Sequence, residues 1–176
     1  MTGDNMHALS IKQPYAWQIL TGDKPYEYRT WLPGTVQQFL LVSSSQPSAM
    51  DFGWGLANGY ALAVVDITGT PQLEDDGSYA WPVKVHAAVT PFPVKGKLHF
   101  YEVADAQIHQ HPEWAADLRQ YQRGASVSEN SAFYRDYLAP LAAIGFSQMP
   151  LKYQKIYNTT RSWGQVGAVW AQVKRQ

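Results

Sequence analysis

One stretch near the start of the chain carries the side chains best suited to holding a nucleotide. Glu27, Arg29 and Trp31 alternate along a β-prone run, so strand geometry predicts that they lie on one face. A carboxylate, a guanidinium and an indole in one row could contact the edge of a base, its phosphate and its ring face. Lys12 and Lys24 precede this run and could converge on it from either side.

The same residues also have a simpler interpretation, in which Glu27 and Arg29 form a structural ion pair and the lysines are solvated. Spacing alone favours it, because such pairs also occur in inert networks. If the site is hydrolytic, Lys24 is the best candidate for base or nucleophile, but desolvation or a cationic neighbour would have to make it neutral. Glu27 would instead keep Lys24 charged, which suits phosphate binding or oxyanion stabilisation better. We therefore expect binding in preference to catalysis.

A strand, a helix and a second strand are predicted around these residues. Residues 8–12 alternate between apolar and polar side chains, which predicts a short strand. Pro14 suits the first turn of a helix, and Gly22 can supply the left-handed residue that ends it. Residues 26–31 are β-prone.

The remaining sequence predicts more strands than helices. Further strands are predicted at residues 39–43, 60–68, 82–90, 98–103 and 167–173. Helices are predicted at 112–122 and 131–144, and Pro140 should begin, kink or end a helical segment. Residues 51–59 are glycine-rich and predict a loop. This mixture predicts an α+β fold, in the form of a small β-barrel with peripheral helices.

Charge and composition narrow the class of ligand. The chain has 14 Lys and Arg residues and 14 Asp and Glu residues, so its formal net charge is zero. A protein that grips long nucleic acid through many phosphates normally carries a basic excess. A modified nucleotide or a short single-stranded RNA segment therefore fits better than a duplex. The absence of cysteine excludes disulfides, thiolate nucleophiles and thiolate metal sites.

Neither a cofactor nor a metal is expected. His109 and His111 have a spacing that a metal could use, but no carboxylate cluster lies nearby in the sequence, and a loop is the better interpretation. The polar first residues lack the features of a signal peptide, and no apolar run could span a bilayer. We expect a cytoplasmic location and no membrane partner; protein partners cannot be named.

The C-terminal region is basic and aromatic. Residues 151–176 contain five Lys and Arg residues and no Asp or Glu. Trp170 lies in an apolar run and is expected in the core. The other aromatic residues could stack on the bases of single-stranded nucleic acid or pack internally. They are Tyr153, Tyr157 and Trp163.

Two segments resemble the ASCH family of the PUA-like superfamily. Residues 10–16, Ser-Ile-Lys-Gln-Pro-Tyr-Ala, precede a Gly-x-Lys-x-x-Glu-x-Arg run at residues 22–29, and together they resemble the family signature. Residues 93–97 resemble its second landmark, a Pro/Gly turn near the middle of the barrel. The resemblance reaches to about residue 100. We interpret residues 1–176 as a single ASCH-like domain with a helical elaboration at about 105–148.

The resemblance implies a PUA-like barrel with a cleft between the first helix and the strands. It also implies RNA binding, hydrolysis of modified cytidines or cleavage of RNA. The catalytic lysine of amidohydrolase-type relatives maps onto Lys24, but their threonine three residues later corresponds to Glu27, so that arrangement is not preserved. The serines that follow the predicted strand at 39–43 could donate hydrogen bonds into the cleft, where relatives often carry small polar residues. The substrate-binding candidates are Lys12, Tyr15, Arg29, Trp31, Ser43 and Ser44.

Three hypotheses remain. The first is a module that binds RNA or a modified nucleotide in this cleft. The second is a hydrolase, either a ribonuclease or a modified-nucleoside amidohydrolase, with Lys24 and Glu27 as catalytic residues. The third is a protein-interaction domain whose charged row is structural.

Overall fold

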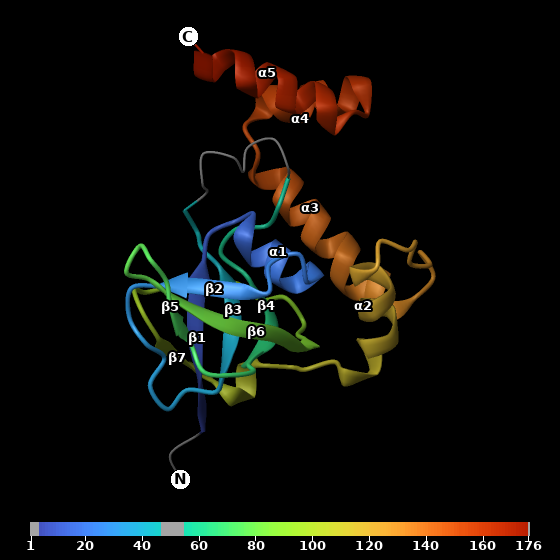
Figure 1. Cartoon of the computed structure of the whole chain (residues 1–176). Helices are drawn as coiled ribbons and strands as arrows, with labels where there is room; N and C mark the ends of the chain where they lie inside the picture. The colour runs from blue at the N-terminus through green and yellow to red at the C-terminus, as the bar shows by residue number, and fades with distance from the viewer. Residues whose placement is uncertain (1–3, 47–54, 176) are drawn as a thin grey trace.

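A mixed seven-stranded sheet forms the body of the molecule (Figure 1). The computed structural model describes residues 4–46 and 55–175. The strand order is β2-β6-β4-β3-β1-β7, and β5 pairs with β6 away from this path. The strands are β1 (Asn5–Ile11), β2 (Tyr26–Arg29), β3 (Gln38–Ser43), β4 (Ala61–Ile67), β5 (Gln72–Leu73), β6 (Tyr79–Ala88) and β7 (Tyr101–Ala104).

The central strands β3 and β4 are apolar on both sides because both faces of the sheet are covered. Leu40 and Val42 pack into one buried cluster, while Phe39 and Leu41 pack into the larger cluster on the opposite face. Alternate side chains of a strand point to opposite faces, so this division follows directly from strand geometry.

Helix α1 (Tyr15–Thr21) connects β1 to β2 and covers the larger core. It buries Ala16, Ile19 and Leu20 and ends at Gly22, whose φ of 83° is left-handed. The backbone N–H of Lys24 then donates to Gln18 O at 3.0 Å, which turns the chain from the helix into β2. The predicted strand, helix and strand are confirmed.

The prediction of a closed barrel is not confirmed, because the described sheet is open. Its end strands, β2 and β7, do not pair with each other. β2 has four residues and, among the described strands, pairs only with β6. The link from β2 to β1 is made by a side chain: Arg29 Nη2 donates to Ser10 O at 3.1 Å. The Arg29 side chain therefore takes the place of the backbone hydrogen bonds that would close a barrel between β2 and β1. An opening remains beside this side chain.

The helical segment after β7 completes the larger core. Trp114, Leu118, Phe133 and Tyr137 are buried among the side chains of α1 and the sheet. The helices fall close to their predicted positions, and Pro140 lies in the first turn of α3. The elements are η2 (Asp105–Gln107), η3 (Pro112–Trp114), α2 (Ala115–Gln122), the π-helical turn η4 (Tyr134–Leu138) and α3 (Ala139–Gln148).

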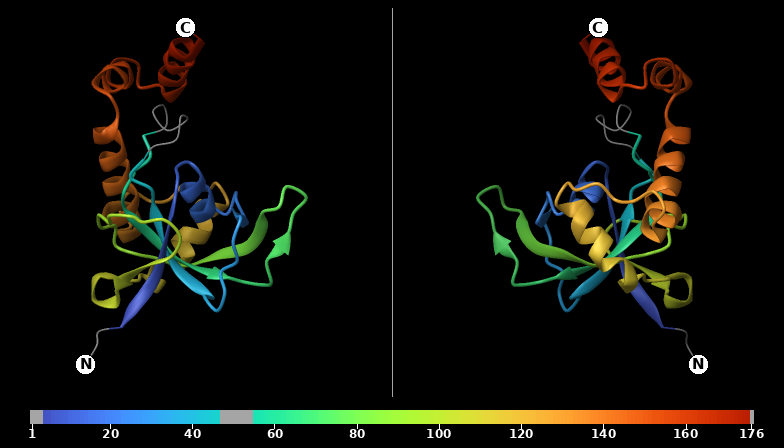
Figure 2. Two further views of the ribbon diagram at one scale, coloured as in Figure 1. Left: turned by 90° about the vertical axis from the view of Figure 1, so that its left-hand side faces the viewer. Right: turned by 90° about the vertical axis from the view of Figure 1, so that its right-hand side faces the viewer.

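The predicted strand at 167–173 is wrong, because this region is helical. Helices α4 (Leu151–Thr160) and α5 (Trp163–Arg175) form a pair that projects beyond α3, away from the sheet (Figure 2). Val166, Val169 and Trp170 have helical spacing and belong to a small apolar cluster between the two helices. The apolar run is too short for its pattern to indicate helix or strand, and packing against α4 determines its conformation.

The aromatic residues of this C-terminal pair pack mainly against one another. Tyr153 is buried, and the half-buried rings of Tyr157 and Trp163 lie 4.3 Å apart between centroids. Of the helices in the described part of the chain, none combines the length and apolar character needed to cross a membrane. Residues 51–54 of the predicted glycine-rich loop lie outside the described residues, and 55–59 form neither helix nor strand.

Tyr137 ties the helical segment to the sheet, which gives a test of this packing. Its hydroxyl is fully buried and donates to Leu62 O at 2.7 Å. Burial raises the pKa of Tyr137 well above its ordinary value, so the hydroxyl stays protonated as a donor. Tyr137→Phe should lower the free energy of unfolding by about 1 kcal/mol in a urea titration, because Leu62 O loses the bond from Tyr137 and keeps the longer one from Val89 N–H at 3.3 Å. Tyr134→Phe is the matched control, and an equal loss there would contradict the assignment.

Candidate nucleic-acid interface

A cleft of about 920 Å³ opens where β2 fails to meet β1. Its walls come from the end of β1, the start of α1, β2 and residues 96–99. It brings together seven of the eight predicted site residues: Lys12, Tyr15, Lys24, Glu27, Arg29, Trp31 and Ser44.

Glu27 is the buried centre of the charged residues in this cleft. It is 4% exposed, and its Oε2 lies 3.2 Å from Lys24 Nζ while its Oε1 lies 3.4 Å from Arg29 Nε. Oε1 also accepts a hydrogen bond from the Tyr28 backbone N–H at 3.1 Å. A carboxylate that is buried and bonded in this way fixes two cations at once. Both of its oxygens are occupied by groups of the protein.

Arg29 is held at two points, which leaves part of its guanidinium for a ligand. Nη2 donates to Ser10 O, and Nε faces Glu27. The Nε contact is an ion pair without good hydrogen-bond geometry. The side chain is 25% exposed, and an arginine has five N–H donors. The remaining donors can therefore meet an anion in the cleft without any rearrangement of the strand.

Lys24 stands between two exposed tyrosines. Its Nζ lies 5.7 Å from the centroid of the Tyr15 ring and 5.5 Å from that of Tyr28, within the range of cation–π attraction. Tyr15 is 43% exposed and Tyr28 is 48% exposed. Exposed aromatic rings beside a cation are the combination that binds single-stranded nucleic acid, since bases stack while phosphates meet the charge.

Trp31 forms a rigid wall of the cleft. Its ring packs on Trp81 and Phe100, with centroids 5.1 and 5.2 Å away, and it lies 4.6 Å from the ring of His99. It is half-buried, so it belongs to the larger core and to the cleft at the same time.

The loop at residues 96–99 closes the cleft on the side of β1. A Cβ at Gly96 would collide with Ser10 Oγ, so any larger residue would have to displace the Ser10 hydroxyl. Ser10 Oγ in turn lies 2.7 Å from the Tyr101 hydroxyl. Burial raises the pKa of Tyr101 and the bond with Ser10 lowers it in part, so this hydroxyl is neutral at physiological pH. Lys97 is exposed in the same loop and adds a further cation.

Ser43 is the predicted site residue that the structure does not bring into the cleft. It is fully buried, and its hydroxyl exchanges hydrogen bonds with the backbone of Tyr60 at 3.1 and 3.2 Å. β3 extends through Ser43, so its side chain belongs to the sheet, and the cleft begins at Ser44.

Among the cleft residues that were not predicted as site residues from the sequence, three carry an aromatic ring or a cation. Strand alternation assigned Tyr28 to the face opposite Glu27, but β2 is an edge strand and the cleft wraps around it, so both faces contribute. Lys97 and His99 arrive from a distant part of the chain. Their only signal was the Pro/Gly landmark at 93–97.

His111 is engaged by neighbouring side chains. Its ring nitrogens contact Thr90 Oγ1 at 2.5 Å and Glu113 Oε1 at 2.7 Å, and it stacks on Trp114. The hydrogen bond from His111 lowers the pKa of Glu113. In the described residues there is no group of three or more His, Cys, Asp or Glu residues that could hold a metal ion.

Comparison with protein families decides the relationship. The model of the ASCH domain matches residues 9–137. The chain belongs to the ASCH domain family. The match covers the cleft strands and also α2 and the π-helical turn, so it extends well past the residues on which the resemblance rested.

No curated protein gives a significant match to this ASCH domain. Family membership is consistent with a general role in RNA binding.

The role of Glu27 as an anchor for both cations can be measured through stability. Glu27→Gln keeps the size and removes the charge, and it should cost about 1–3 kcal/mol of unfolding free energy because two partly buried cations lose their partner. Glu102→Gln, on an exposed position of β7, should change it by less than about 0.5 kcal/mol. Equal effects of the two substitutions in urea titrations would show that Glu27 does not organise the cleft.

Proposed function

We propose that this ASCH domain binds a nucleotide, either within single-stranded RNA or as a free modified nucleotide, in the cleft at the edge of β2. The observation that carries the proposal is the placement of Lys24 and Arg29 on one buried carboxylate, with the exposed tyrosines beside them. Lys24 and Arg29 meet the phosphate, and Tyr15 or Tyr28 stacks on the base.

The charge of the cleft supports an anionic ligand. Glu27 neutralises one of its two bound cations, so Lys24 and Arg29 together keep one positive charge. Lys12 and Lys97 line the same cleft and form no ion pair with a described residue. The local excess coexists with a net charge of zero for the whole chain, which favours a small ligand over a long duplex.

The contacts of Glu27 favour a binding role over catalysis. A general base must be able to take up a proton from the substrate, and Glu27 is buried with both oxygens bonded within the protein. Lys24 lies 3.2 Å from Glu27, and an ammonium group in such an ion pair is suited to binding a phosphate and unsuited to abstracting a proton. Arg29 and Trp31 act as further binding residues, and Lys12 and Ser44 line the same cleft.

The proposal predicts a specific loss of RNA affinity. Arg29→Ala and Lys24→Ala should each weaken the binding of a fluorescently labelled short oligouridylate by about tenfold or more, because each removes a charge-assisted hydrogen bond. Fluorescence anisotropy at fixed salt measures this. Arg135→Ala removes an equal charge from an exposed position outside the cleft and should change the affinity little.

The same samples distinguish the competing hypotheses. Gel analysis of the RNA and chromatography of a panel of modified cytidines, with chelator and with added divalent metal, should show intact substrate. Turnover that Lys24→Ala abolishes would instead establish a hydrolase. An affinity unchanged by both cleft substitutions would overturn the nucleotide site and leave the protein-interaction hypothesis.

A further inference from the structure

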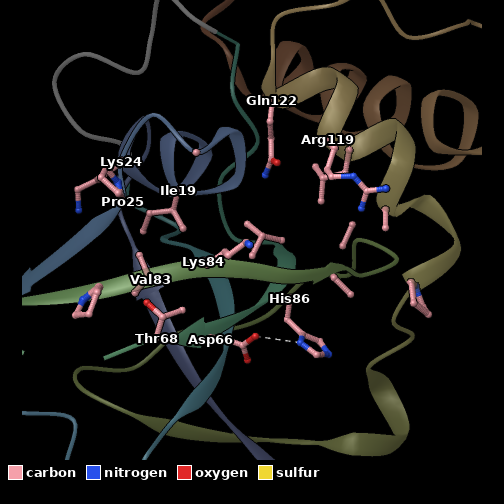
Figure 3. A pocket seen from close by; sticks show the side chains of 18 of the residues that line it. Ile19, Lys24, Pro25, Asp66, Thr68, Val83, Lys84, His86, Arg119 and Gln122 are labelled. Atoms are coloured by element: carbon pink, nitrogen blue, oxygen red, sulfur yellow. Dashed lines mark hydrogen bonds and ion pairs between the residues drawn. The ribbon is translucent and has the colours of Figure 1, made fainter. Parts of the chain in front are cut away.

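A second cavity, of about 830 Å³, lies between β6 and α2 (Figure 3). We call it the β6–α2 groove. Arg119 and Gln122 enter it from α2 and Lys84 from β6, while Lys24 and Pro25 lie at the end nearest β2. Gln122 Nε2 also donates to Leu20 O at 2.9 Å, which fixes α2 against α1.

The groove exists because β2 is too short to cover β6. β2 pairs with residues 79–82 of β6, and β4 pairs with residues 83–88 along the opposite edge. In the described part of the chain, no strand pairs with the edge of residues 83–88 that faces away from β4. The two ends of this edge are engaged: Val83 N–H donates to Pro25 O at 2.9 Å, and His111 N–H donates to Ala88 O at 2.8 Å. Between these ends α2 lies beside β6 in place of a strand, and a helix leaves space between itself and the strand edge.

The groove carries cations without matching carboxylates. Neither Lys84 nor Arg119 forms an ion pair with a described residue, and both are exposed. Asp66 is the one carboxylate among the lining residues. Its oxygens are already engaged, Oδ1 by Gln38 Nε2 at 2.7 Å and Oδ2 by His86 Nδ1 at 3.1 Å (Figure 3). An anion entering the groove therefore meets two unpaired cations and a carboxylate that is already partnered.

Lys24 makes the groove continuous with the cleft, because it lines both cavities. A chain whose phosphate contacts Lys24 in the cleft can pass over Pro25 and Tyr26 and reach Lys84 and Arg119 in the groove.

We propose that the β6–α2 groove binds the phosphates of the nucleotides next to the one held in the cleft, so that the domain grips an extended segment of single-stranded RNA. This inference rests on the proposed function of the cleft and deepens it. It assigns Lys84 and Arg119 to the RNA backbone and requires a ligand longer than one nucleotide. The unpaired edge of β6 could also accept an extended acidic peptide, but continuity through Lys24 favours RNA.

The experiment compares two probes on the same variants. Uridine monophosphate occupies only the cleft, and a longer oligouridylate reaches the groove. The double variant Lys84→Ala/Arg119→Ala should weaken oligouridylate binding by about tenfold or more and lower its salt slope by about 0.7 for each lost phosphate contact. The affinity for the monophosphate should not change. Arg135→Ala is the control for charge loss, and thermal unfolding verifies that each variant is folded.

The outcomes separate this proposal from the function of the cleft. Monophosphate binding that is lost in Arg29→Ala, combined with oligouridylate binding that is insensitive to the double variant, would overturn the groove and keep the cleft. Oligouridylate binding that depends on Lys84 and Arg119 without any monophosphate binding would support the groove and overturn the cleft. If an acidic peptide binds in the groove while RNA affinity does not depend on Lys84 and Arg119, the assignment of the groove to RNA is overturned.

Discussion

A single buried carboxylate determines the geometry of the cleft. Glu27 lies on an edge strand, faces inward and draws Lys24 and Arg29 to its two oxygens. Burying an unpaired carboxylate would destabilise the fold, so the two cations stabilise Glu27 while Glu27 positions them. Arg29 extends this arrangement to β1 through Ser10 O, and Lys24 extends it to the two tyrosines. The cations of the cleft are therefore held in position by the protein itself, which would reduce the entropy lost if the proposed nucleotide binds there.

The short length of β2 explains why the cations face open space. On one side β2 does not reach β1, and the cleft opens there. On the other side β2 pairs with only the first part of β6, and the β6–α2 groove begins where this pairing ends. Both cavities share Lys24 because this residue lies at the entry to β2. The helical segment after β7 contributes the far wall of the groove and several buried residues of the larger core.

The sequence predicted local features better than their consequences in three dimensions. Alternation correctly placed Glu27 and Arg29 on one face, and the strands, α1 and the central helices lie close to their predicted positions. Alternation does not reveal which face is buried, or that a cleft can wrap around an edge strand and include Tyr28. The helix α5 was missed because its conformation depends on packing against α4. The open sheet was missed because the closure of a barrel depends on the lengths and pairing of its strands.

The most direct measurement is a titration of the isotopically labelled domain with uridine monophosphate, followed by ¹H–¹⁵N NMR. The backbone N–H of Tyr28 and the Nε–H of Arg29 both face Glu27, and the indole N–H of Trp31 reports on the wall of the cleft. The account predicts that these signals shift together and saturate with one dissociation constant. Signals that stay fixed there while those of α4 and α5 move would contradict it and place the nucleotide on the C-terminal helices.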